Sequence, residues 1–226
     1  MKDSRLIVDA VLFDLDGTLI DSIDIYIRIA EEIFRRLDLQ PVSGARILER
    51  IRDTNNNWES LFPVETKERD SLIREAKGVF QEISPRLFTE DIKMIPGSVS
   101  TLKGIAGAGI RIGLVTSTHA RSLDGKLRPL KEKDVLKLIE VTVAIEDTPR
   151  IKPEPDPLIE CARRMGVPLH KSVYVGDSRT DIRAGNSAGM KTIGVLTGMD
   201  DYDTIKNEDP YTIIGSVAEL SHVICY

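Results

Sequence analysis

The chain has 226 residues, of which 41% are hydrophobic, enough to fill one large core or a core with a smaller inserted unit. Its 31 lysines and arginines against 36 aspartates and glutamates give a formal net charge of −5, which argues against a basic protein that attracts nucleic acid or an anionic membrane. No stretch of about 20 uncharged apolar residues predicts a signal peptide or a membrane span, so we expect a cytoplasmic protein whose partner is a small molecule.

The first predicted element, in the segment AVLFDLDGTLIDS, ends in two closely spaced carboxylates. Residues 11–13 form a short apolar run, which is typical of a strand buried on both faces of a parallel sheet. Asp14 and Asp16 follow on the same side of an extended chain, so both can point into the crevice where open α/β sheets bind ligands. At about 5 Å their repulsion is roughly 3 kcal/mol, which calls for a cation, a shared proton or a dense set of hydrogen bonds. By themselves they also fit a solvated strand end followed by a turn at Asp16-Gly17.

Residues 21–92 are predicted to form an all-helical unit inserted after this strand. Apolar residues recur at helical spacing along it, first at Ile23, Ile27, Ala30 and Phe34 and later at Leu72, Ala76, Val79, Phe80 and Ile83.

From residue 93 onward the pattern changes to helices, glycine-marked turns and short apolar strands. The strand candidates are IRIGLV, VTVAI, SVYVG and KTIGVL, at residues 110–115, 141–145, 172–176 and 191–196. With the first strand they predict an α/β fold, a Rossmann-like doubly wound parallel sheet built by residues 1–20 and 93–226. The helical unit would then cover the carboxyl ends of the strands as a lid.

Polar side chains follow three of these later strands. Thr116 and Ser117 come after the strand at 110–115, where their hydroxyls can hold an oxyanion, although the segment TSTHARS suits helix N-capping as well. Lys152 lies between prolines that stiffen its backbone. Asp177 follows the strand at 172–176, and Asp181 is about one helical turn further on. Together with the first aspartate pair, these residue types suit Mg²⁺ and a phosphate group.

At these residues the chain resembles the haloacid dehalogenase-like superfamily of phosphohydrolases, over nearly its whole length. DLDGT is similar to the first motif of that superfamily, Thr116 to the second, Lys152 in KPEPD to the third and GDSRTD to the fourth, with a helical cap inserted after the first motif. The segments around the second and fourth motifs are most similar to phosphoglycolate phosphatase-like enzymes. The resemblance implies a magnesium-dependent phosphatase that hydrolyses a small phosphorylated metabolite, with phosphoglycolate first among several candidates.

The resemblance also implies roles for the aspartates. Asp14 is assigned as the nucleophile, and an aspartyl-phosphate would divide one hard hydrolysis into two easier steps. Mg²⁺ would be held by Asp14, the backbone carbonyl of Asp16 and Asp177, with Asp181 orienting Lys152 or a water at the metal. Asp16 would give a proton to the leaving group and later take one from water. An acidic residue at position 16 indicates that the substrate is a phosphate ester, because members that cleave carbon–halogen bonds or phosphonates are expected to lack an acid there.

The remaining site residues are expected to bind the substrate. Thr116, Ser117 and Lys152 would hold the phosphate oxygens, and Thr18 would steady the loop that carries Asp16.

Two parts of the chain depart from the family pattern. The helical segment matches no specificity signature, although its Arg52 and Trp58 offer a cation and an aromatic ring to the leaving group. Tyr211-Thr212, on the last strand, replaces an aspartate that relatives often carry.

Three other functions fit part of the pattern. A phosphomutase would use the same four motifs and return the phosphoryl group to a second sugar hydroxyl. A signalling receiver domain also gathers acidic residues, a threonine and a lysine around magnesium, but its phosphate-accepting aspartate would not follow the first strand. A binding protein with an inactive site fits poorly, because all the motif residues are present.

Overall fold

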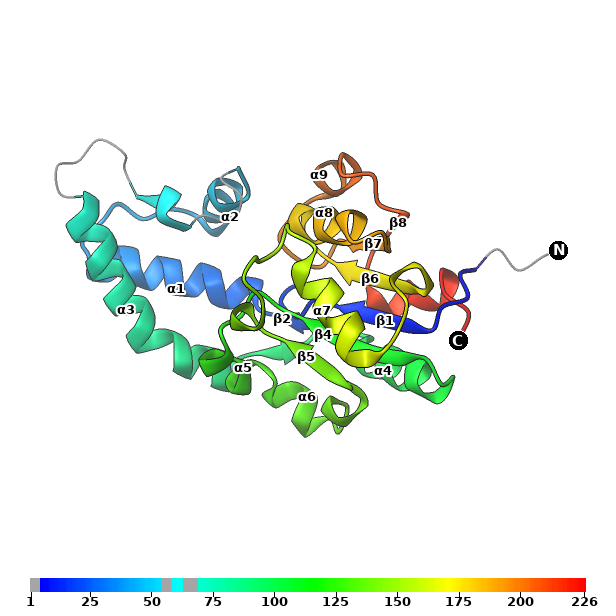
Figure 1. Cartoon of the computed structure of the whole chain (residues 1–226). Helices are drawn as coiled ribbons and strands as arrows, with labels where there is room; N and C mark the ends of the chain where they lie inside the picture. Colours follow the sequence, from blue (N-terminus) through cyan, green and yellow to red (C-terminus); the bar gives the residue numbers. More distant parts are fainter. Residues whose placement is uncertain (1–4, 54–57, 63–68) are drawn as a thin grey trace. The chain divides into compact units, whose positions relative to one another are not determined.

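The structure is a computed structural model that describes residues 5–53, 58–62 and 69–226 (Figure 1). The chain divides into two compact units. Met1–Asp21 and Lys93–Tyr226 form one of them, here called the sheet unit, and Ser22–Ile92 form the other, here called the helical unit.

Six parallel strands form the sheet, in the order β5-β4-β1-β6-β7-β8. Their bounds are β1 Ala10–Phe13, β4 Arg111–Val115, β5 Val141–Val143, β6 Ser172–Gly176, β7 Lys191–Val195 and β8 Thr212–Ile214. In β1, Val11 lies opposite Ile112 on one side and Val173 on the other, and all three residues are fully buried. This central position explains why β1 is a continuous apolar run and not an alternating one. The predicted Rossmann-like, doubly wound α/β class is confirmed.

Helices lie on both faces of the sheet. α7 (Asp156–Met165) packs on β4 and β5, and α8 (Arg179–Ser187) packs on β6 and β7. Their apolar side chains share one core with Ala10 and Leu12. Because successive side chains of a strand point to opposite faces of the sheet, Val11 and Phe13 point to the other face. α4 (Ser98–Gly107) packs on β4 and against the 3₁₀ helix η5 (Val217–His222).

Shorter elements complete the sheet unit. They are α5 Ala120–Lys126, α6 Arg128–Glu132, α9 Tyr202–Lys206 and the 3₁₀ helices η2 Leu136–Leu138, η3 Ile145–Asp147 and η4 Leu169–Lys171. β2 (Ile20–Asp21) and β3 (Lys93–Met94) pair antiparallel where the chain leaves and re-enters this unit.

The helical unit contains α1 Ile23–Arg36, α2 Gly44–Asp53, the 3₁₀ helix η1 Trp58–Leu61 and α3 Arg69–Glu90. Aromatic rings join these elements, because Tyr26 meets Phe88 edge to face at 5.2 Å and Phe34 stacks on Phe62 at 5.8 Å. The buried stripe of α1 is Ile25, Ile29, Ala30, Ile33 and Phe34. The predicted stripe is therefore rotated, and two of its members, Ile23 and Ile27, are partly exposed.

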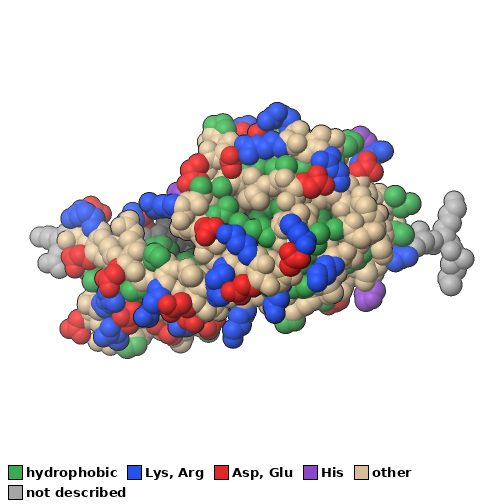
Figure 2. All heavy atoms as spheres, turned by 90° about the horizontal axis from the view of Figure 1, so that it is seen from below, with side chains coloured by type: hydrophobic (Ala, Val, Ile, Leu, Met, Phe, Trp, Pro, Cys, Tyr) green, Lys and Arg blue, Asp and Glu red, His purple; other side chains and the backbone are tan. Residues whose placement is uncertain are grey.

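The molecular surface agrees with the mixed charge of the sequence. Figure 2 shows acidic and basic side chains interspersed over one face of the molecule. Of the two cysteines, Cys161 is buried, and its burial raises the pKa of the thiol to about 12, so it behaves as an apolar residue. Among the helices of the described residues, none combines the length and the apolar character needed to cross a membrane.

Candidate active site

Lys152 holds two carboxylates together at the carboxyl ends of the central strands. Asp14 directly follows β1, and its backbone N–H donates to the carbonyl of Val175 in β6 at 2.9 Å. The Nζ of Lys152 donates to Oδ1 of Asp14 at 2.6 Å and to Oδ1 of Asp181 at 2.7 Å. Burial opposes the charge on Lys152, but the two carboxylates prevail and raise its pKa well above the usual value. Lys152 is therefore an ammonium ion.

Tyr174 supports this ammonium from inside the sheet. Its hydroxyl accepts from Nζ of Lys152 at 3.0 Å and donates to Oδ1 of Asp181 at 3.0 Å. Burial raises the pKa of this phenol well above its usual value, so it stays protonated and able to donate. The sequence pattern does not single out Tyr174, because within SVYVG it is one more member of a buried strand.

Asp177 directly follows β6, and Asp181 lies in the first turn of α8. Thr18 donates to Oδ1 of Asp177 at 3.1 Å, and the backbone N–H of Met199 donates to Oδ2 at 2.7 Å. Asp181 also forms a capping box with Ser178, whose N–H and hydroxyl contact Oδ2 at 3.1 and 2.6 Å. Both oxygens of Asp181 thus have protein donors, and one of those donors is Lys152.

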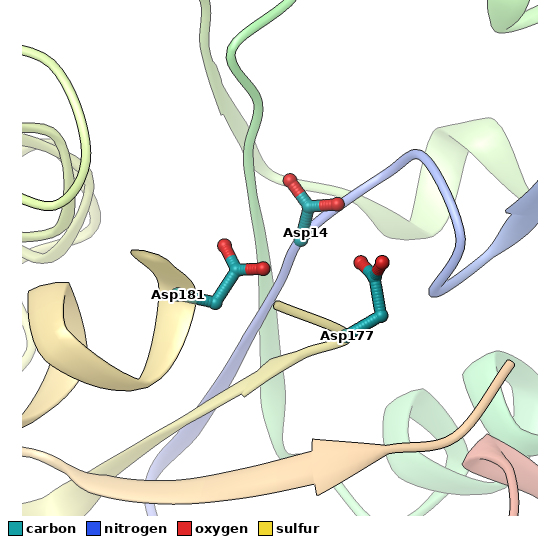
Figure 3. Close-up of side chains that lie close together, drawn as sticks. All are labelled: Asp14, Asp177 and Asp181. Carbon is teal, nitrogen blue, oxygen red and sulfur yellow. The ribbon is translucent and has the colours of Figure 1, made fainter. Parts of the chain in front are cut away.

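The carboxylates of Asp14, Asp177 and Asp181 lie close together (Figure 3). One carboxylate oxygen from each residue lies within 4.8 Å of the corresponding oxygens of the other two, and all three residues are buried. Burial, opposed by Lys152 and reinforced by the other carboxylates, raises the pKa of Asp14 to about 7. Burial and the neighbouring carboxylates also raise the pKa of Asp177 well above its usual value. One ammonium does not balance these carboxylates, so the cluster favours a further cation.

Two glycines bring backbone close to Asp177. A Cβ on Gly198, in the loop after β7, would lie 1.9 Å from Oδ2 of Asp177, and one on Gly17 would lie 2.6 Å away. Gly17 also has a φ of +77°, which favours glycine. Thr197 joins the two loops by donating to the carbonyl of Gly17 at 2.6 Å. The loop after β7 was not among the predicted contributors.

Asp16 pairs with a different lysine. The Nζ of Lys126, in α5, lies 2.7 and 2.8 Å from the two carboxylate oxygens of Asp16. Thr118 donates to Oδ2 of Asp16 at 2.9 Å and accepts from Lys126 at 3.0 Å. No sequence signal distinguishes Lys126, because a lysine in LDGKLRPL looks like any exposed helical lysine.

The loop after β4 carries Thr116 and Ser117. Thr116 is buried, and its hydroxyl accepts from the backbone N–H of Thr118 at 3.1 Å. Ser117 is exposed, whereas the next residue, Thr118, faces the cluster around Asp16. The N-cap of α5 is His119, without a capping bond from its side chain, so the hydroxyls of this loop do not cap the helix.

Arg52 and Trp58 belong to α2 and η1 of the helical unit. Their side chains lie outside the described part of the structure.

Comparison with known proteins identifies the family. The model of the haloacid dehalogenase-like hydrolases matches residues 11–195, from β1 through β7. The chain belongs to this family. It is an enzyme, a hydrolase of the phosphatase class, as the names of its relatives indicate.

Relatives of this haloacid dehalogenase-like hydrolase cover most of the chain. A Clostridium perfringens protein provisionally named pyrophosphatase PpaX is 32% identical over 189 residues, 83% of this chain and 84% of the relative. The phosphoglycolate phosphatase of Escherichia coli is 28% identical over 233 residues, 94% of this chain and 91% of the relative. The crystal structure of a Lactobacillus plantarum protein, provisionally named phosphoglycolate phosphatase, has a TM-score of 0.78 at 20% identity and covers 97% of this chain and all of its own. That structure shows a shared fold.

A hard divalent cation fits the donor set of this haloacid dehalogenase-like hydrolase. Carboxylate and carbonyl oxygens are the ligands that Mg²⁺ and Ca²⁺ take in proteins. Asp14 and Asp177 suit this role, because Lys152 contacts only one oxygen of Asp14, and because burial beside other carboxylates raises the pKa of both carboxyl groups, so that a cation there would favour their charged forms. Asp181 suits it less, since the ammonium of Lys152 and the hydroxyl of Tyr174 contact its Oδ1 and Ser178 contacts its Oδ2, whereas the two donors to Asp177 are uncharged.

Proposed function

We propose that the protein is a magnesium-dependent phosphatase that hydrolyses a small phosphorylated metabolite, phosphoglycolate or a similar compound, through an aspartyl-phosphate on Asp14. The observation that carries this proposal is the buried cluster of Asp14, Lys152, Asp177 and Asp181. It combines a carboxylate nucleophile, a fixed ammonium and a site for a hard cation within one small volume.

The proposed roles follow from the contacts. Asp14 attacks phosphorus, and Lys152 and Thr116 hold the phosphoryl oxygens as charge develops on them. Asp181 and Tyr174 keep the ammonium of Lys152 directed at Asp14. In this reading Asp181 is a positioning residue.

Asp14, Asp177 and the backbone carbonyl of Asp16 would hold Mg²⁺. The ion supplies positive charge that lets an anionic carboxylate approach an anionic phosphate. Thr18, Met199 and the two close glycines fix the carboxylate of Asp177 for this purpose.

Asp16 would protonate the leaving oxygen in the first step and accept a proton from the attacking water in the second. The helical unit, Ser22–Ile92, would act as the cap that excludes water, with Arg52 and Trp58 selecting the substrate. Pyrophosphate is the second substrate candidate, because the relative with 32% identity carries the name of a pyrophosphatase.

A phosphate-release assay over a panel of metabolites tests this proposal. The panel includes phosphoglycolate, pyrophosphate, sugar phosphates and p-nitrophenyl phosphate, each with Mg²⁺ and with EDTA. We expect phosphate release that needs Mg²⁺ and prefers a small substrate, and a changed preference in Arg52→Ala if the cap selects it. Formation of a sugar phosphate isomer without phosphate release would instead identify a phosphomutase, and no reaction with any compound would contradict both.

A further inference from the structure

A second buried lysine lies beside the proposed site. The side chain of Lys126 is only 3% exposed, although it belongs to the seven-residue helix α5. Its ammonium contacts both carboxylate oxygens of Asp16, at 2.7 and 2.8 Å, and the hydroxyl of Thr118 at 3.0 Å.

This arrangement is a poor way to gain stability. Removing an ammonium ion from water costs several kcal/mol, and a buried ion pair often returns no more than it loses. The side chain of Asp16 is 22% exposed, so water can still solvate that carboxylate without help from a lysine. What the pair does provide is orientation, because contacts to both oxygens fix the plane of the carboxylate.

Thr118 ties this orientation to the rest of the site. Its hydroxyl donates to Oδ2 of Asp16 at 2.9 Å, and its backbone N–H donates to the hydroxyl of Thr116 at 3.1 Å. The same loop therefore positions the carboxylate of Asp16 and the hydroxyl proposed to hold phosphate.

We propose that Lys126 is a positioning residue that holds the carboxylate of Asp16 where it accepts a proton from the water that attacks the aspartyl-phosphate. This inference rests on the proposed function, because it assumes that Asp14 carries the phosphoryl group and Asp16 acts as the base. In the step concerned, the oxygen of water forms a bond to phosphorus, the bond from phosphorus to Asp14 breaks, and the proton of water moves to Asp16. Lys126 itself exchanges no proton and acts only through the carboxylate of Asp16, whose two oxygens it contacts.

Rapid-mixing kinetics of Lys126→Met with p-nitrophenyl phosphate test this role. Nitrophenolate leaves without needing a proton, so the first step should keep its rate in the variant. The second step should slow by roughly 10- to 100-fold, because a misplaced base loses much of its contribution. The expected trace is a burst of about one nitrophenolate per active site at the wild-type rate, followed by slow turnover, and Lys126→Arg should recover part of that turnover.

Lys131→Met is the matched control, because Lys131 is a half-exposed lysine of the neighbouring helix α6, paired with Asp124. It should behave as the wild type. Adding Lys126→Met to Asp16→Asn should cause no further loss, since Lys126 acts through the carboxylate that Asn removes. Thr118→Val provides a second variant with the same expected trace, and circular dichroism checks the fold of each protein.

Several results would overturn the inference. They are an unchanged second step, an equal slowing of burst and turnover, a further loss in the Asp16→Asn background, or unfolding of both Lys126→Met and Thr118→Val. Different results would contradict the proposed function itself: a wild type that hydrolyses no phosphate ester, or an Asp14→Asn variant that retains its activity.

Discussion

The Nζ atom of Lys152 lies 2.6 Å from Oδ1 of Asp14, although 138 positions separate the two residues in the chain. Both side chains are buried, and Asp181 shares the ammonium at 2.7 Å. The contact fixes one oxygen of Asp14, while the described residues place no hydrogen-bond donor on the other oxygen, Oδ2. This leaves one oxygen of a buried carboxylate for phosphorus or a cation.

Replacing Asp14 by asparagine should abolish turnover without unfolding the protein. The change keeps the size of the side chain and removes the nucleophilic oxygen, so we expect a loss of at least about 1,000-fold in kcat, or roughly 4 kcal/mol. Asp124→Asn is the control, because that carboxylate is 87% exposed and belongs to a surface ion pair. Activity of Asp14→Asn within about tenfold of the wild type would rule out the covalent mechanism.

The close approach of Gly198 to Asp177 predicts a specific loss of metal affinity. A Cβ at this position would lie 1.9 Å from Oδ2 of Asp177, so Gly198→Ala should displace the carboxylate. The Mg²⁺ concentration that gives half-maximal activity should rise about tenfold or more, as expected when a ligand loses its support. Gly107→Ala is the control, because no atom lies within 4 Å of its added Cβ. Equal requirements for Mg²⁺ in the two variants would exclude Asp177 as a ligand.

The stability of the metal-free protein should fall as the pH rises from about 4 to 7. Burial raises the pKa of Asp14 from 3.8 to about 7, so in this range the folded protein holds a proton that the unfolded chain has lost. The folded state then binds more protons than the unfolded state, and its free energy of unfolding decreases as pH increases. Asp177 is shifted in the same direction.

Thermal unfolding in EDTA at pH 5 and pH 8 measures this effect. We expect a lower Tm at pH 8, a smaller difference in Asp14→Asn, and recovery of the Tm at pH 8 when Mg²⁺ is added. A pH dependence that is the same in the wild type and in Asp14→Asn would contradict the assignment to this carboxyl group.

Replacing Asp16 by alanine should separate the two steps of the reaction. With p-nitrophenyl phosphate, we expect a burst of about one nitrophenolate per active site and then turnover slowed by roughly 100-fold, with phosphate trapped on Asp14. With phosphoglycolate, whose alkoxide needs a proton, the burst should disappear as well. Intact-protein mass spectrometry would detect the phosphorylated enzyme. Steady turnover of Asp16→Ala on both esters would show that Asp16 transfers no proton.

The sequence by itself was enough to predict the α/β class and the strands at the centre of the sheet. A strand buried on both faces must be apolar throughout, so residues 11–13 and 172–176 were recognisable without any partner. The polar residues that directly follow such strands share their edge of the sheet by covalent connection, which is why Asp14 and Asp177 could be located. The stripe of α1 was less well predicted, because several isoleucines allow more than one apolar face.

Only the tertiary structure decided which side chains and backbone groups contact each carboxylate of the site. Lys126, Tyr174 and Gly198 carry no local signal, since a lysine in a helix, a tyrosine in a strand and a glycine in a loop are all common there. Lys126 reaches Asp16 across 110 positions, and Met199 reaches Asp177 from the loop after a different strand. A hydrogen bond or ion pair requires its two atoms to lie about 3 Å apart. A sequence pattern predicts only which side of one helix or strand a residue occupies. The partners of each carboxylate therefore depend on how the strands and helices pack together.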